Sequence, residues 1–228
     1  MNRRLHRRVV QLAAGIALLF GASLTANSSA QADASSGLPS VASTDARSSV
    51  TTLTAAQRAD LQSQVDETLS TTAGGVQISA NEIAWNGGEP ILTLPLPGQE
   101  QAPAASPAAR DLMGFSADDA TPDVNWHKCP AGGDDNRWYC FYENSNFGGR
   151  RLQWNWAHCQ DPIAFDDYGF ARKASSWVNT TRNIDHWGMK VEVYSTSVRL
   201  WVENPWSQVA YVGDSKNDRA MHAFACRL

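Results

Sequence analysis

The C-terminal half of the sequence predicts an all-β domain, an antiparallel β-sandwich over residues 125–228, on three observations. Short alternating runs such as "RWYCFY" and "KVEVYS" recur between clusters of Gly, Asn, Asp and Pro. No run of ten or more residues in this part has a convincing helical period. Eight of the nine tryptophans and all four cysteines lie here. One sandwich core needs about 100 residues, so the segment can form a single domain.

Residues 1–32 predict a secretory signal peptide, because four arginines and no acidic residue precede a short apolar run that ends in "AQA". The run is short for a membrane span, so a retained anchor is the less favoured alternative. Arg3 and Arg4 leave open whether export follows the general secretory or the twin-arginine route. We expect residues 33–52, which are rich in Ser, Thr and Ala, to be a disordered leader. The mature protein is therefore expected to be secreted and extracellular.

The charge of the mature chain argues against several partners. Without the signal, 15 of the 19 basic residues and all 23 acidic residues remain, which gives a net charge of −8. No basic run is interleaved with aromatics, so we expect neither a nucleic acid nor, once the signal is removed, a membrane as partner. No catalytic triad, carboxylate pair or metal-ligand motif is visible. The sequence therefore predicts a protein that is not an enzyme and needs no cofactor. We also expect the protein to be a monomer.

Residues 53–97 predict a small helix-hairpin segment. Thr54 can cap a helix in which Leu61, Val65 and Leu69 recur every four positions. The turn sequence "NGG" at residues 86–88 separates two strand-like halves. A segment this short is marginal alone, so we expect it either to dock on its neighbour or to act as a pro-segment. Residues 98–124, rich in Pro and Ala, predict a linker.

The stretch "CFYENSNFGGRRLQW" has the pattern of a folded-over hairpin. Tyr142 leaves a strand, a polar turn doubles back, Phe147 packs over the turn, and Gly149 takes a backbone geometry closed to side chains. This arrangement resembles the Greek-key motif of the βγ-crystallin family. That family pairs the hairpin with a later strand that carries two adjacent serines, and "KASSWVN" supplies Ser175 and Ser176. The resemblance implies a βγ-crystallin-like Greek-key β-sandwich.

The remaining residues look like a worn second copy of the motif, in which the looped turn has shrunk to "STS". Calcium-binding members of the family use two Asn or Asp residues followed by a Ser or Thr and a Ser. Here the first motif has the serines without the acids, and the second has Asn217 and Asp218 without the serines. Arg172 and Lys173 add positive charge to the first motif. Calcium is therefore possible at Asn217 and Asp218 but disfavoured.

Residues 129–228 also resemble the actinobacterial peptidase inhibitor family I36, through the opening "CPAG" and the body "FGGRRL…SSWVN". The resemblance implies a metalloprotease inhibitor whose partner is a secreted protease. Such an inhibitor needs a rigid loop that fits the protease cleft. The best candidate is the irregular "NWAHCQDPIAFDDYGF", anchored by Cys159, which would present Pro162, Ile163 and Phe165. The family's reactive bond has no clear match in this sequence.

Four cysteines in an exported chain predict two disulfides, for which three pairings exist. We favour Cys129–Cys140, which would brace the first strand, and Cys159–Cys226, which would tie the long loop to the last strand. Two other functions remain as alternatives to inhibition. One is a calcium-binding or structural βγ-crystallin-like protein. The other is a cell-wall or glycan-binding module, suggested by the many tryptophans, although these are favoured to fill the core.

Overall fold

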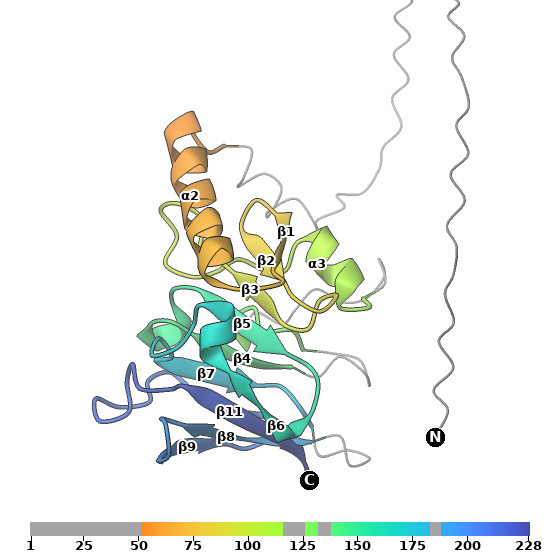
Figure 1. Ribbon diagram of the computed structural model, residues 1–228, viewed down its shortest axis with the longest axis vertical. Helices are drawn as coiled ribbons and strands as arrows, with labels where there is room; N and C mark the ends of the chain where they lie inside the picture. Colours follow the sequence, from red (N-terminus) through yellow and green to blue (C-terminus); the bar gives the residue numbers. More distant parts are fainter. Residues whose placement is uncertain (1–51, 116–125, 132–137, 183–187) are drawn as a thin grey trace, which may run out of the picture. The chain divides into compact units, whose positions relative to one another are not determined.

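The computed structural model describes residues 52–115, 126–131, 138–182 and 188–228. The predicted signal, almost all of the predicted leader and the second part of the predicted linker lie outside these residues. No helix in the described parts of the chain is long and apolar enough to cross a bilayer. Two antiparallel sheets dominate the structure, as Figure 1 shows, and this confirms the predicted β-sandwich.

The larger sheet has seven strands and the smaller sheet has four. In spatial order, the larger sheet consists of β1 (Val76–Ser79), β2 (Glu82–Ala84), β3 (Ile91–Thr93), β5 (Arg151–Trp154), β4 (Tyr139–Tyr142), β7 (Ser176–Asn179) and β10 (Ser207–Val209). The smaller sheet consists of β6 (His158–Ala164), β11 (His222–Arg227), β8 (Met189–Tyr194) and β9 (Arg199–Glu203). The helices are α2 (Ala55–Thr71) and α3 (Pro107–Leu112), with short 3-10 turns at Ser145–Phe147 and Phe165–Tyr168.

The two sheets exchange strands between the two halves of the C-terminal domain. Strands β4 to β7 form the first Greek-key motif, but its third strand, β6, lies in the smaller sheet beside β11. Strands β8 to β11 form the second motif, and its third strand, β10, lies in the larger sheet beside β7. This reciprocal exchange confirms the βγ-crystallin-like Greek-key sandwich predicted from the hairpin motif. It also confirms that the second half repeats the first.

The central strands of the larger sheet are buried on both faces, whereas the edge strands β1 and β10 are partly exposed. One face packs against the smaller sheet and α2 around Tyr139, Phe141 and Trp154. The opposite face packs beneath α3 around Cys140 and Val178. Neighbouring residues of a strand point to opposite faces, so β4 is buried along its whole length. The tryptophans of the strands fill this core, as the sequence analysis favoured over a role in glycan binding.

Helix α2 begins and packs as its sequence predicts. The Thr54 hydroxyl accepts a hydrogen bond from the backbone of Gln57, whose side chain accepts one from the Thr54 backbone, forming a capping box. Leu61 and Val65 are buried in the core. The predicted turn lies between β2 and β3, where Gly87 has a φ of 77°. A second hairpin, β1–β2, was not predicted.

Residues 53–115 are continuous with the sandwich, and this corrects the linker prediction for residues 98–115. Strand β3 pairs with β5 from Ile91 to Thr93, so the N-terminal segment docks by extending the larger sheet. Beyond β3, in the first part of the expected linker, Ser106 caps the short helix α3. Small side chains at positions 102, 105 and 109 are buried and let this segment approach the sheet closely. The Pro- and Ala-rich segment, although its composition is typical of linkers, packs closely over one face of the larger sheet.

Arg151 of β5 ties this cover to the sheet. Its side chain is fully buried, and it donates to the Gln153 side chain at 2.8 Å, to the Pro103 carbonyl at 2.9 Å and to the Thr93 hydroxyl at 3.3 Å. Burial lowers the pKa of its guanidinium, and the nearby Glu82 acts in the opposite direction. Arginine stays charged even so. Two of its partners therefore lie in the N-terminal segment.

Candidate functional site

The folded hairpin brings together the five residues that the sequence pattern singled out. The rings of Tyr142 and Phe147 meet edge to face, with centroids 5.5 Å apart. The Ser176 hydroxyl accepts from the Phe147 backbone at 3.1 Å and donates to a carbonyl in the turn at 2.7 Å. The Ser175 hydroxyl donates to the Glu143 carbonyl at 2.7 Å. The serine pair thus pins the turn onto β7.

Glycine is required at position 149 for two reasons. Gly149 has a φ of 72°, and a Cβ placed on it would lie 2.8 Å from the Cβ of Glu143. On the other side of the turn, the His127 ring stacks on Phe147 at 3.6 Å. Burial lowers the pKa of His127, which favours the neutral ring in this stack. The hairpin is therefore a rigid structural element.

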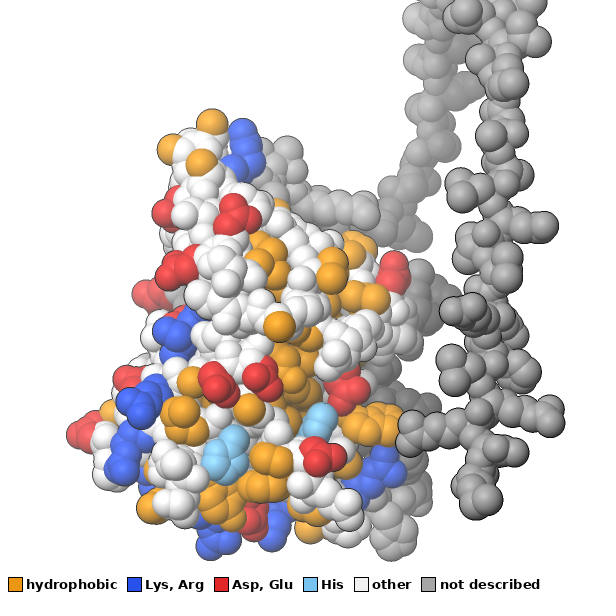
Figure 2. Space-filling model, in the orientation of Figure 1, with side chains coloured by type: hydrophobic (Ala, Val, Ile, Leu, Met, Phe, Trp, Pro, Cys, Tyr) orange, Lys and Arg blue, Asp and Glu red, His pale blue; other side chains and the backbone are white. Residues whose placement is uncertain are grey.

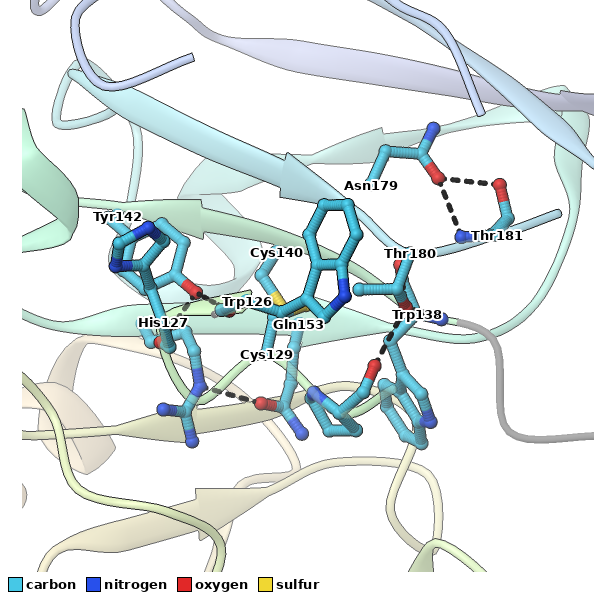
Figure 3. The surroundings of a disulfide bond; sticks show 12 residues. Trp126, His127, Cys129, Trp138, Cys140, Tyr142, Gln153, Asn179, Thr180 and Thr181 are labelled. Atoms are coloured by element: carbon cyan, nitrogen blue, oxygen red, sulfur yellow. Dashed lines mark hydrogen bonds between the residues drawn. A yellow bond between two sulfur atoms is a disulfide. The ribbon is translucent and has the colours of Figure 1, made fainter. Parts of the chain in front are cut away.

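The first disulfide joins Cys129 to Cys140 in the interior (Figure 3). Both sulfur-bearing residues are fully buried. The segment that carries Cys129 is also held by hydrogen bonds, because the Tyr142 hydroxyl donates to the His127 carbonyl at 2.9 Å. The Thr180 hydroxyl lies 2.7 Å from the Pro130 carbonyl, to which it donates. This disulfide braces the first strand, as predicted.

The second disulfide joins Cys159 of β6 to Cys226 of β11. The pairing favoured from the sequence is thus the one in the structure. Cys159 is exposed and Cys226 is partly exposed. The bond closes 67 residues, whereas Cys129–Cys140 closes 11. The two disulfides therefore differ both in accessibility and in the length of chain that they restrain.

We expect the two disulfides to be reduced one after the other, Cys159–Cys226 first. A mild reductant should open Cys159–Cys226 in the folded protein, while the buried Cys129–Cys140 survives until the protein unfolds. Loop-closure entropy predicts a loss of about 4 kcal/mol for the long loop and about 3 kcal/mol for the short one. Alkylation followed by peptide mass mapping at increasing reductant checks the order. Simultaneous loss of both bonds would contradict the expectation.

The predicted inhibitory loop is in fact a strand followed by a 3-10 turn. Residues 158–164 form β6, which pairs with β11 at the edge of the smaller sheet. Cys159 and Pro162 are exposed, but Ile163 is 3% exposed and Phe165 is fully buried in the core. The two side chains proposed to enter a protease pocket therefore face inward. This strand was not predicted because it contains Pro162. Proline is uncommon within strands, but it is tolerated at a sheet edge.

Residues of the two incomplete calcium motifs line one recess of about 650 Å³. Ser175 comes from the first motif, and Asn217 and Asp218 come from the second. The Asn217 side chain donates to Asp218 at 2.7 Å, and its own carbonyl oxygen is buried without a hydrogen-bond partner. Arg172 and Lys173 line the same recess. Their positive charge opposes a bound Ca²⁺.

Glu143 also borders this recess but is already neutralised. It forms an ion pair with Arg150 at 2.9 Å and lies 3.9 Å from Lys173. Burial acts to raise the pKa of Glu143, but the hydrogen bonds and charge of Arg150, with help from Lys173, outweigh it and lower the pKa. Within the described residues, no group of three or more His, Cys, Asp or Glu side chains is arranged to hold a metal ion.

An exposed loop connects β9 to β10, and no sequence pattern predicted it as a site. We call residues 204–206 the Trp206 loop. The Trp206 side chain is 41% exposed, yet its backbone has a φ of 55°, which is unusual for a bulky residue. The Arg182 guanidinium lies 3.7 Å from the Trp206 ring centroid, and the Trp126 ring lies at 4.5 Å. The loop thus presents a large aromatic side chain in a fixed position.

The Trp206 loop is braced at both ends by different sheets. It follows β9, the edge strand of the smaller sheet, and precedes β10, the edge strand of the larger sheet. The Ser207 hydroxyl closes the turn by donating to the Asn204 carbonyl. The one feature of the sequence that indicates this loop is the pair Pro205 and Trp206, which lies between two alternating runs. The alternating pattern predicted core positions for Trp154, Trp177 and Trp201 and gave no position for Trp206.

Comparison with known proteins gives little beyond the fold. No protein-family model and no curated protein sequence matches the chain. Two solved structures are similar to it: a double mutant of clostrillin in complex with nickel, and a mutant of a βγ-crystallin domain from Clostridium beijerinckii. Each shares 20% identity, covers 39% of this chain and 95% or 99% of its own, and has a TM-score of 0.27. The class of fold, a βγ-crystallin-like Greek-key domain, rests instead on the strand exchange and the folded hairpin.

Proposed function

We propose that the mature chain is a secreted peptidase inhibitor of the metalloprotease-directed kind, and that the Trp206 loop enters the cleft of its target. The observation that carries this proposal is the fixed, exposed position of Trp206 between two edge strands. It replaces the segment around Ile163, whose side chains are buried. The resemblance to family I36 supports the class of function, and the site supports its placement.

The Trp206 loop meets the physical demands on an inhibitory segment. Its geometry is set before binding by Arg182 and Trp126, which lowers the ordering cost of association. Tryptophan and arginine are also the side chains that dominate binding energy at protein interfaces. If the backbone of the loop were cleaved, its two ends would remain hydrogen-bonded in β9 and β10. A cleaved loop would therefore not separate readily from the enzyme.

The surface of the domain also favours a protein partner. On the face drawn in Figure 2, acidic, basic and hydrophobic side chains are interspersed over the part that holds the smaller sheet. A polyanion would require a field of one sign. Protein interfaces, in contrast, combine apolar contacts with charges of both signs.

The test is titration of the mature protein against a panel of secreted metallo- and serine peptidases. We expect nanomolar to micromolar inhibition of at least one metallopeptidase, and a Trp206→Ala variant should weaken it by about 30-fold or more, the range of an interface hot spot. Trp156→Ala is the matched control, because Trp156 is 56% exposed and also lies beside an arginine, Arg227, at 5.7 Å. Its inhibition should equal that of the unaltered protein.

Each alternative function gives a different result in the same experiment. Unchanged inhibition by Trp206→Ala would exclude the loop, and no inhibition of any peptidase would exclude the function. Retention of the protein on cell-wall or chitin-type polysaccharide would indicate a glycan-binding module instead. A melting temperature raised by calcium would indicate a calcium-dependent structural protein, because a ligand that binds the folded state must stabilise it.

A further inference from the structure

The carboxyl group of Glu203 lies in an unusual environment at the base of the Trp206 loop. Glu203 is the last residue of β9 and is fully buried. The Trp201 ring nitrogen donates to its Oε1 at 3.0 Å. Its Oε2 is buried and has no hydrogen-bond partner. A carboxylate is stable in such a position only if it is paired or protonated.

The cations on the strands around Glu203 are paired elsewhere: Lys190 of β8 and Arg199 of β9 both form ion pairs with Glu192. Across the sheet, Val191 of β8 is its partner in register. From β7, the Asn179 side chain donates to its backbone carbonyl at 3.5 Å. The Tyr139 hydroxyl of β4, which donates to the Trp156 carbonyl, interacts with Glu203 through electrostatics alone: burial, Glu89 and Glu203 together raise the pKa of Tyr139. No described Lys, Arg or His forms an ion pair with Glu203.

The surroundings therefore favour the neutral acid. Burial raises the pKa of Glu203 well above its ordinary value, and the Trp201 hydrogen bond opposes this only in part. In the open state, where water reaches the side chain, the pKa returns to about 4.3. The closed state is thus fully stabilised below that pH and loses stability as the pH rises toward the folded-state pKa.

Strand β9 is also placed to open without disturbing the core strands. It pairs with β8 alone, so its outer edge is free. Detaching its end breaks the last pairs of one ladder and the 3.5 Å hydrogen bond from Asn179, whereas β4 is held between β5 and β7. Local opening of an edge strand costs less than global unfolding. The Trp206 loop would move with the end of β9, to which it is joined.

We propose that Glu203 is a pH-sensitive latch beneath the Trp206 loop. The protonated side chain holds the end of β9 against the core, and the ionised side chain draws that end and the loop into water. The latch itself depends only on this geometry, whereas its use to weaken peptidase binding as the pH rises rests on the proposed function. A binding surface of this kind would be best ordered in mildly acidic surroundings.

Hydrogen exchange of individual amides between pH 5 and 8 tests the latch. Hydroxide catalysis alone speeds exchange by about tenfold per pH unit, and an opening that ionises one buried acid adds about another tenfold. The amides of β9 and Asn204 should therefore show a slope of 2 on a logarithmic scale from pH 5 up to the closed-state pKa of Glu203, above which the slope returns to 1. Glu203→Gln, which keeps the acceptor for Trp201, should reduce the slope to 1. Glu192→Gln, on the neighbouring strand, should leave it at 2.

Three results would overturn the proposal. They are a slope of 1 over the whole pH range in the unaltered protein, a slope of 2 that persists in Glu203→Gln, and a slope of 2 at β9 with the same protection as Phe141 of β4. The last result would mean that ionisation opens the whole sandwich and not the end of one strand. None of these readouts depends on inhibition, so the latch and the proposed function fail separately. If both hold, the inhibition constant should rise with pH in the unaltered protein and not in Glu203→Gln.

Discussion

A chain that begins at residue 116 should fail to unfold cooperatively, whereas a chain that begins at residue 52 should melt like the mature protein. The shorter chain keeps every strand of both Greek-key motifs but loses β1 to β3 and both helices. It would expose the edge of β5, which β3 covers, and the face of the larger sheet that packs beneath α3. Burial of apolar surface stabilises by about 25 cal/mol per Å², so exposing about 400 Å² of this core would already cost about 10 kcal/mol, within the usual margin of stability of about 5–15 kcal/mol.

Circular dichroism melts and urea titrations of the two chains check this expectation. The chain from residue 52 is the control, since it removes the leader but no described secondary structure. A cooperative transition for the shorter chain, with a near-ultraviolet spectrum like that of the longer one, would contradict the expectation. It would also restore the interpretation of residues 53–97 as a removable pro-segment.

Replacement of Arg151 by Ala should destabilise the protein by about 3–5 kcal/mol, the cost of breaking a buried charged network. The substitution leaves the Thr93 hydroxyl, the Gln153 amide and the Pro103 carbonyl without the hydrogen bonds that the guanidinium now makes. It also leaves a cavity next to Glu82, which is 1% exposed and loses the nearby positive charge. Chemical denaturation at pH 7 measures the loss.

Arg150→Ala is the matched control, one residue away on the same strand-hairpin junction. Arg150 forms its ion pair with Glu143 near the surface, where its side chain is 15% exposed. Partly exposed ion pairs contribute about 1 kcal/mol or less. Equal losses for the two variants would show that the N-terminal segment does not depend on the Arg151 network.

The sequence was sufficient where a local pattern determines the structure. The spacing of Tyr142, Phe147 and Gly149 predicts the folded hairpin because each residue acts within that short stretch. Thr54 and Gln57 predict the start of α2 for the same reason. The alternating runs predict seven of the eight strands of the two motifs.

The sequence was misleading where the structure depends on distant contacts. Small residues at 102, 105 and 109 look like linker composition, and only the sheet beneath them makes them a packed cover. Four consecutive residues of β6, 159–162, are exposed, so the strand lacks an alternating pattern. Without that strand, Ile163 was assigned to a loop, and the inhibitory site was placed on a segment whose apolar side chains face the core.

The exchange of β6 and β10 between the sheets has a consequence for how the two motifs diverge. Neither half of the domain can close a core alone, because each borrows a strand from the other. When the hairpin of one motif shortens, its strands are still held in register by pairing with a strand of the other motif. The second motif therefore keeps its fold despite the reduced "STS" turn, because strands of the first motif hold its strands in place.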